Sequence, residues 1–185
     1  MLVVLDACVL YPPSLRDLLL TLAALDAFDV RWSETILEEL RRNVVADSPQ
    51  LDAARFSSHT LAEMRRHFPE AVVSVGQADI DGLDNHPKDR HVAAVAVKAG
   101  ADAIVTINMR DFRSRILEAG GVSVVTPGQL VEAVLDEAPE LVSYALRRMS
   151  SRWTNPPHSI SEIVELLARH PTMARPMSRV RGTSG

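Results

Sequence analysis

The chain has 185 residues, of which 46% are hydrophobic and 24% are charged, and its formal net charge is −4. This charge argues against a protein that coats nucleic acid by bulk electrostatics, although it leaves room for local basic patches. No apolar run approaches the roughly 20 residues that span a bilayer, and the single cysteine, Cys8, excludes an intrachain disulfide. We therefore expect a cytoplasmic protein with one sizeable core, no secretion signal and no membrane association.

Strands and helices alternate along the first 136 residues. The expected elements, in chain order, are a strand over residues 2–5, a helix from Pro13, an extended piece over 30–32, helices over 33–46 and 49–68, a strand over 71–73, a helix over 87–99, a strand over 103–107, a short helix, a strand over 122–125 and a helix from Pro127. Strands that alternate with helices pair in parallel through right-handed crossovers. The pattern thus predicts a three-layer α/β/α sandwich with a central parallel sheet.

The remainder of the chain is predicted to contain helices and no strand. Residues 137–170 predict a C-terminal helical extension, with helices over 139–153 and 159–169. Residues 171–185 contain Arg175, Arg179 and Arg181 but no acidic residue, and we expect a flexible basic tail there. The extension could bind a partner or cover the sheet, and its sequence does not choose between these roles.

Four acidic residues from distant segments could meet at one edge of this sheet. Asp6 ends the first strand, and Asp111 follows the strand over 103–107, whereas Glu39 and Asp89 lie on helices. Ligands of open parallel sheets bind beyond the carboxyl ends of the strands. Because carboxylates repel one another, a protein that gathers them commonly holds a divalent cation there.

Helix geometry selects two of these acids. At about 100° per residue, Asp89 shares the apolar, inward face of its helix with Ala96. Glu39 flanks the apolar stripe that contains Leu40, whereas Glu38 points away from it. Taken singly, each acid could equally be a turn former, a helix cap or a solvated residue, so the prediction depends on all four together.

Four short segments, in order, resemble the PIN-domain family, and in particular the VapC-type ribonucleases of bacterial toxin–antitoxin pairs. They are Val3-Val4-Leu5-Asp6-Ala7-Cys8-Val9-Leu10, Ile36-Leu37-Glu38-Glu39-Leu40, Asp89-Arg90-His91-Val92-Ala93-Ala94 and Val105-Thr106-Ile107-Asn108-Met109-Arg110-Asp111-Phe112. The resemblance implies a PIN-like nuclease domain over 1–136 that binds Mg²⁺, or Mn²⁺, and cleaves RNA as a metal-dependent endoribonuclease. It also implies a cognate antitoxin as partner and a homodimer.

Carried over by position, the resemblance makes Asp6, Glu39, Asp89 and Asp111 the catalytic acids, with Asp6, Asp89 and Asp111 as metal ligands. Supporting roles fall to Asn108, as a neutral ligand or water holder, and to Thr106, a hydroxyl residue beside the site. Many family members have Asn or Ser where this chain has Cys8, which we interpret as a packing residue rather than a nucleophile.

Three arginines, Arg110, Arg113 and Arg115, follow the acidic strand end and either contact RNA phosphates or form a solvated basic face. Two other functions are alternatives to the nuclease: a catalytically silent PIN-like module that binds RNA or protein, and a phosphohydrolase of the haloacid-dehalogenase type. The second alternative requires an Asp two residues after Asp6, where this chain has Cys8.

Overall fold

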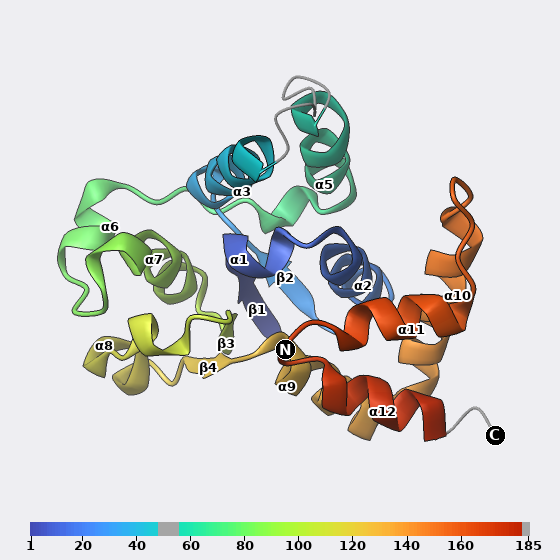
Figure 1. Ribbon diagram of the computed structural model, residues 1–185. Coiled ribbons are helices and arrows are strands. Elements are labelled where there is room, and N and C mark those ends of the chain that lie inside the picture. Colours follow the sequence, from blue (N-terminus) through green and yellow to red (C-terminus); the bar gives the residue numbers. More distant parts are fainter. Residues whose placement is uncertain (48–55, 183–185) are drawn as a thin grey trace.

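The computed structural model describes residues 1–47 and 56–182, and a four-stranded parallel sheet lies at its centre (Figure 1). The strands are β1 (Leu2–Leu5), β2 (Asp29–Arg31), β3 (Ala103–Val105) and β4 (Ser123–Val125), in the order β2-β1-β3-β4. Val3 pairs with Val30 on one side and with Ala103 on the other. Because β1 is central, its apolar residues are buried on both faces, which explains the uninterrupted apolar run.

Helices surround this sheet. They are α1 (Ala7–Leu10), α2 (Pro13–Ala23), α3 (Glu34–Asp47), the π-helical turn η1 (Phe56–Leu61), α5 (Ala62–His67), α6 (Gln77–Asp81), α7 (Arg90–Ala99), α8 (Arg115–Ala119), α9 (Pro127–Glu137), α10 (Pro139–Arg152), α11 (Ile160–Ala168) and α12 (Ala174–Gly182), with 3₁₀ turns η2 (Pro69–Ala71), η3 (Pro87–Asp89) and η4 (Met109–Phe112). In Figure 1, α7 lies on one side of the strands and α2 on the other. This arrangement confirms the predicted α/β/α architecture.

Local signals in the sequence explain several helix boundaries. Ser114, Thr126 and Ser159 cap α8, α9 and α11, since each side-chain oxygen accepts a backbone N–H three residues later. Gly100 ends α7 in a left-handed conformation with φ of 62°. The predicted helix over 49–68 starts outside the described residues, and its described part is η1 followed by α5.

The predicted strand over residues 71–73 is wrong. Pro69 opens the 3₁₀ turn η2, and only Val72 then forms a bridge to Trp32, at the edge of the sheet. The Val73 N–H donates to the Trp32 carbonyl, and the Trp32 N–H donates to the Ala71 carbonyl. The proline-led turn thus leaves too little extended chain for a strand.

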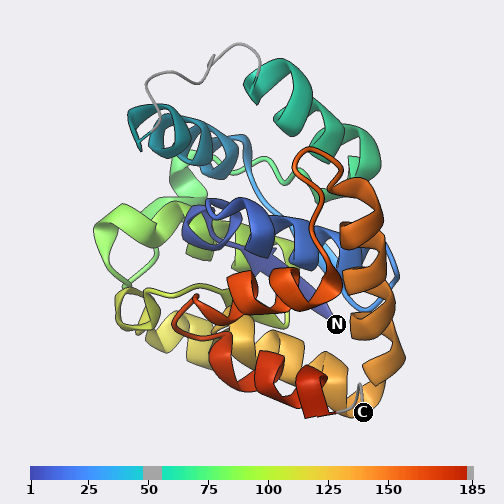
Figure 2. The same cartoon turned by 45° about the vertical axis from the view of Figure 1, so that its right-hand side comes forward.

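The C-terminal helices form a layer over α2 and α9 (Figure 2). Near the end of α10, Asp17 of α2 accepts hydrogen bonds from the Arg152 guanidinium at 2.6 Å and from the Trp153 indole N–H at 2.7 Å. Gly128, in the first turn of α9, allows the turn before α12 to approach closely, because a Cβ there would lie 1.7 Å from the Thr172 carbonyl oxygen. The predicted helical extension therefore packs tightly against the α/β domain.

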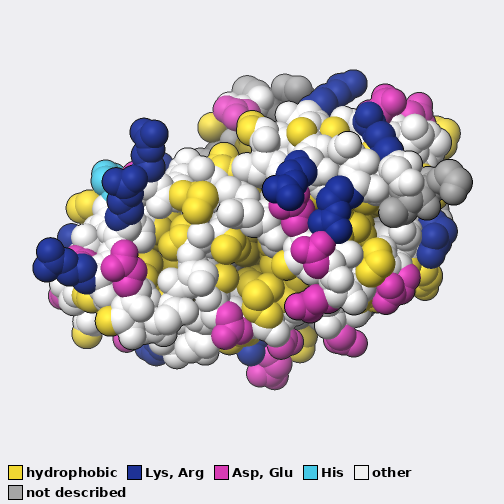
Figure 3. All heavy atoms as spheres, turned by 90° about the horizontal axis from the view of Figure 1, so that it is seen from below, with side chains coloured by type: hydrophobic (Ala, Val, Ile, Leu, Met, Phe, Trp, Pro, Cys, Tyr) yellow, Lys and Arg dark blue, Asp and Glu magenta, His cyan; other side chains and the backbone are white. Residues whose placement is uncertain are grey.

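Over the described residues 171–182, the structure differs from the prediction of a flexible tail over 171–185. Residues 174–182 form α12, in which Met177 is fully buried. Arg175 forms an ion pair with Glu132, and Arg179 forms one with Asp136, and Figure 3 shows basic and acidic side chains side by side on this face. Met173, Met177 and Val180 are buried with helical spacing, so the segment gains enough apolar contact to fold against α9.

Candidate functional site

The strand order places one edge of the sheet where a ligand site is expected. The chain leaves β1 for β2 on one side and later returns to place β3 on the other side, so the order reverses between β1 and β3. Such a reversal opens a crevice beyond the carboxyl ends of the two strands. Asp6 follows β1 there and Thr106 follows β3.

Asp6 is 4% exposed, and two neighbouring side chains hold one of its carboxylate oxygens. The Thr106 hydroxyl donates to Asp6 Oδ2 at 2.7 Å, and the Cys8 thiol donates to the same oxygen at 3.0 Å. Thr106 Oγ1 in turn accepts the Asn108 N–H at 3.0 Å. The supporting role predicted for Thr106 thus has a concrete basis, since this hydroxyl links β3 and the segment after it to Asp6.

Cys8 is a hydrogen-bond donor in this arrangement. Burial, together with the negative charge of Asp6, raises the pKa of the Cys8 thiol to about 12. A thiol with such a pKa stays protonated at neutral pH and can donate to a carboxylate, but it is not an activated nucleophile. Its position two residues after Asp6 is the sequence signal for this role.

Asp89 is the residue whose pKa is affected by the charges of all three other acids. Asp89 ends η3, and α7 begins directly after it. The residue is buried, with 5% of its surface exposed. Burial raises the pKa of Asp89, and the charges of Asp6, Asp111 and Glu39 raise it further, whereas Lys88 lowers it. The structure therefore brings all four predicted acids into one electrostatic neighbourhood.

Asp111 lies in η4 and is half-buried, whereas Asn108 at the start of that turn is exposed. The carbonyl of Asp111 accepts the His86 N–H at 3.0 Å and the Asn85 side-chain amide at 3.4 Å. The loop that precedes Asp89 is thereby joined to the turn that contains Asp111. Asn85 is buried and was not predicted, since an Asn in a polar loop gives no signal of a contact 26 residues away.

Glu39 projects from α3 toward the start of α7. Its Oε2 lies 3.3 Å from Nε2 of His91, and this pairing lowers the pKa of Glu39 despite the opposing effect of burial. Glu38, in contrast, is exposed and forms an ion pair with Arg41 on the same helix. The helix-face argument for Glu39 over Glu38 agrees with this geometry.

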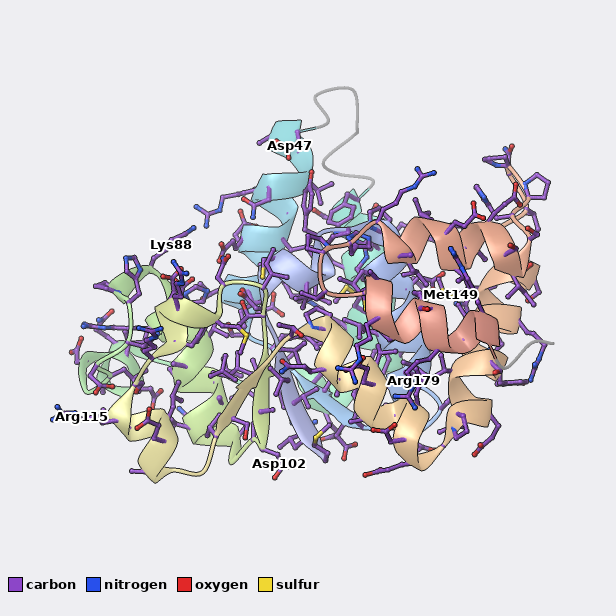
Figure 4. All side chains as sticks on the ribbon, turned by 60° about the horizontal axis from the view of Figure 1, so that its bottom comes forward. Asp47, Lys88, Asp102, Arg115, Met149 and Arg179 are labelled. Atoms are coloured by element: carbon purple, nitrogen blue, oxygen red, sulfur yellow. The ribbon has the colours of Figure 1, made fainter. Side chains whose placement is uncertain are left out.

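The three arginines predicted to contact phosphates are all on the surface of the protein. Arg110, Arg113 and Arg115 are exposed, and Arg115 projects from the outer edge of the molecule (Figure 4). Besides His91, the cations that lower the pKa of Glu39 are Lys88 and Arg42, and Lys88 also lowers the pKa of Asp89. Lys88 was missed because its effect depends on the approach of α3 to α7, which its position beside Asp89 alone does not show.

The donor set suits a hard divalent cation. Among residues 1–47 and 56–182, no group of three Asp, Glu, His or Cys side chains is arranged to hold a metal ion by itself. Asp6 and Asp89 form the buried core, with Asp111 and Glu39 around it. This fits Mg²⁺, which keeps several waters and is bound through one or two carboxylates together with substrate phosphates.

A cleft of about 690 Å³ lies away from these acids, between α2, α5 and α10. Asp17, Met64, Phe68 and Trp153 are among its lining residues, and none of the four acids lines it. The acid cluster is therefore a site at the edge of the sheet and is distinct from this cleft.

Comparison with known proteins identifies the family to which the chain belongs. Residues 2–110 match the PIN domain family (PIN_3). The chain belongs to the PIN-domain family. Residues 127–173 match the VapC50 C-terminal domain, a match that starts at the first residue of α9 rather than at the predicted boundary after residue 136.

One curated relative from Mycobacterium tuberculosis, named "Putative ribonuclease VapC50", is 30% identical to this PIN-domain protein over 88 residues. The match covers 48% of this chain and 52% of the relative, so it spans about half the length of that protein. No solved structure matches the chain significantly. In addition, no helix in the described ranges is long and apolar enough to cross a membrane.

Proposed function

We propose that this PIN-domain protein is a metal-dependent endoribonuclease that hydrolyses RNA phosphodiester bonds at the acid cluster. The observation that carries the proposal is the pair of buried aspartates at this edge of the sheet, with Asp6 4% exposed and held by the Thr106 hydroxyl at 2.7 Å, and Asp89 5% exposed. The charges of Asp6, Asp111 and Glu39, together with burial, raise the pKa of Asp89. Repulsion of this kind destabilises a protein unless a cation relieves it. The cluster also lies at the strand-order reversal, where parallel sheets bind ligands.

In this proposal Asp6 and Asp89 are the principal ligands of Mg²⁺, for which Mn²⁺ can substitute, and Asp111 would turn toward the ion to complete the set when it binds. Such an ion, when bound, lowers the pKa of a coordinated water and stabilises charge on a phosphate. Thr106 and Cys8 keep Asp6 oriented through their donated hydrogen bonds. Glu39 orients water at the mouth of the site, Asn108 supplies a neutral oxygen or holds water, and Arg110, Arg113 and Arg115 contact flanking RNA phosphates.

We further propose that the protein is the toxin of a type II toxin–antitoxin pair, is cytoplasmic, acts as a homodimer and binds a cognate antitoxin. The name of the mycobacterial relative and the match to the VapC50 C-terminal domain support this assignment. Residues 1–136 would form the nuclease domain and residues 137–170 the helical extension. Co-purification of the full chain with the protein encoded beside it tests the partner, and light scattering tests the dimer.

The decisive experiment compares Asp6→Asn with a matched control. Asp102 is suitable because it lies at the opposite end of the strands, where it accepts the Leu2 N–H at 2.7 Å (Figure 4). Loss of one outer-shell group at a metal site costs about 10–100-fold, so D6N is expected to lose at least about 100-fold of Mg²⁺-dependent RNA cleavage. D102N keeps the exposed hydrogen-bond acceptor and should keep its rate within roughly twofold.

Full cleavage by D6N, with its fold intact by circular dichroism, contradicts the proposal. Calorimetric titration with Mn²⁺ separates the nuclease from the silent RNA- or protein-binding alternative, since the silent module gives no carboxylate-dependent binding. Parallel assays on single-stranded RNA, structured RNA and flap DNA identify the nucleic acid that is cut. The haloacid-dehalogenase alternative has little support, because the position of its second Asp is a thiol with a pKa of about 12.

A further inference from the structure

His91 and Glu39 form a contact between α7 and α3 that the proposed chemistry has not yet used. Their side chains are only 14% and 18% exposed, and Nε2 of His91 lies 3.3 Å from Oε2 of Glu39. His91 lies two residues after Asp89, so the first turn of α7 places a metal-binding carboxylate and this imidazole together. The two helices contact each other directly.

The orientation of the His91 ring is fixed from its other side. Nδ1 lies 3.0 Å from the carbonyl oxygen of Lys88, and because that oxygen can only accept, Nδ1 carries the hydrogen. Nε2 consequently points at Glu39. This nitrogen is buried and has no well-aligned hydrogen bond in the structure, and the oxygen that it faces, Glu39 Oε2, can only accept. Both ring nitrogens therefore face acceptors, and the ring pairs with Glu39 in its imidazolium form, with a hydrogen on each nitrogen.

The same contact orders a long acidic side chain. Glu39 lies at the border of the apolar face of α3, and a glutamate there has several accessible rotamers of similar energy. Within the protein, the negative charge of Asp6 also acts on His91, which places the imidazole beside the acid cluster and not only beside α3. An anchor at this point selects the Glu39 conformation that faces the cluster.

We propose that His91 is a positioning residue that holds the Glu39 carboxylate toward the Asp6–Asp89 core. The proposal rests on the proposed nuclease function and assigns no chemical step to His91. Displacement of a catalytic group by about 1 Å can cost on the order of 100-fold in rate. Removal of the anchor is therefore expected to lower kcat more than it raises KM for RNA.

The test is a double-mutant cycle in the full chain with H91A, E39A and the combined variant. If His91 acts through Glu39, H91A lowers kcat/KM by about 10–100-fold, and the double variant is no slower than E39A alone. H91Q should recover part of the rate, because its amide can donate to Glu39. An H91A rate within twofold of wild type, or single-variant losses that simply multiply in the double variant, overturns the proposal.

A second pair in the chain provides a matched control. His67 Nε2 lies 3.3 Å from Glu63 Oε2, the same separation, but this pair is largely exposed on α5 and Glu63 also binds Arg66. The variants H67A and E63A should leave RNA cleavage unchanged. A loss there similar to that of H91A would attribute the effect to general destabilisation and refute the positioning role.

Urea unfolding of the same variants without metal provides a readout that does not depend on catalysis. A direct pairing predicts non-additive unfolding equilibrium constants for H91A and E39A, with coupling of about threefold or more, and additive constants for H67A and E63A. If wild type cleaves no RNA, the proposed function fails, and this coupling still decides whether His91 holds Glu39. Additive unfolding constants for H91A and E39A refute the pairing itself.

Discussion

Replacement of Thr106 by valine tests how the site holds its first carboxylate. The side chains have nearly the same shape, so T106V removes one hydroxyl from a fully buried position. Asp6 Oδ2 then loses its 2.7 Å hydrogen bond, and the Asn108 N–H loses its 3.0 Å acceptor. A hydrogen bond to a charged group contributes about 1.5–3 kcal/mol and a neutral one about 0.5–1.5 kcal/mol, so the expected destabilisation is roughly 2–4.5 kcal/mol.

The assay is urea unfolding of T106V and T106S at neutral pH without metal. T106S keeps the hydroxyl and loses only a methyl group, which costs roughly 1 kcal/mol. We expect T106V to be the less stable variant and to cleave RNA more slowly, because Asp6 keeps only the Cys8 donor on that oxygen. Equal stability of T106V and T106S, both within about 0.5 kcal/mol of wild type, would refute the inference that the hydroxyl supports Asp6.

Three further predictions concern packing and titration. G128A should destabilise the protein by at least about 2 kcal/mol, because its Cβ would lie 1.7 Å from a backbone oxygen, whereas G82A, with no atom within 4 Å, should be neutral to urea unfolding. Cys8, whose pKa is about 12, should react with a thiol reagent at pH 8 at least about 100-fold more slowly in the folded chain than in urea. The raised pKa of Asp89 predicts that D89N without metal matches wild type below the unfolded-state pKa of about 4 and becomes the more stable protein in thermal melts as pH rises through the folded pKa. Equal stability at pH 7, or a reversed trend with pH, would contradict this sign.

The parts of the site that could be predicted are those that depend on one element at a time. An apolar run that ends in Asp6 identifies a central strand and the edge to which it leads. Helix phase separates Glu39 from Glu38, and the two residues do face different surroundings. Asp89 was expected within a helix and instead ends the 3₁₀ turn before it, although it is buried there as the helix phase predicted.

Contacts between distant elements could not be predicted in this way. The pairing of His91 with Glu39 depends on how closely α7 approaches α3, and no local pattern determines that distance. The fold of α12 was missed for a similar reason. Its sequence has the composition of a basic tail. In the folded protein, however, its arginines pair with Glu132 and Asp136 of α9, and Met177 is buried.

The two buried aspartates are held in different ways, and the difference follows from the strands and turns that carry them. Asp6 extends directly from a central strand, where the thiol of Cys8 in its own segment and the hydroxyl of Thr106, directly after β3, hold one oxygen. Asp89 lies at a helix start opposite three other carboxylates, and its pKa is raised by burial and by their charges. Without a cation, repulsion in the cluster is therefore relieved most readily by a proton on Asp89. A metal ion competes with a proton for this oxygen, so cation affinity should fall as pH decreases through the pKa of Asp89, while the donors that hold Asp6 stay in place.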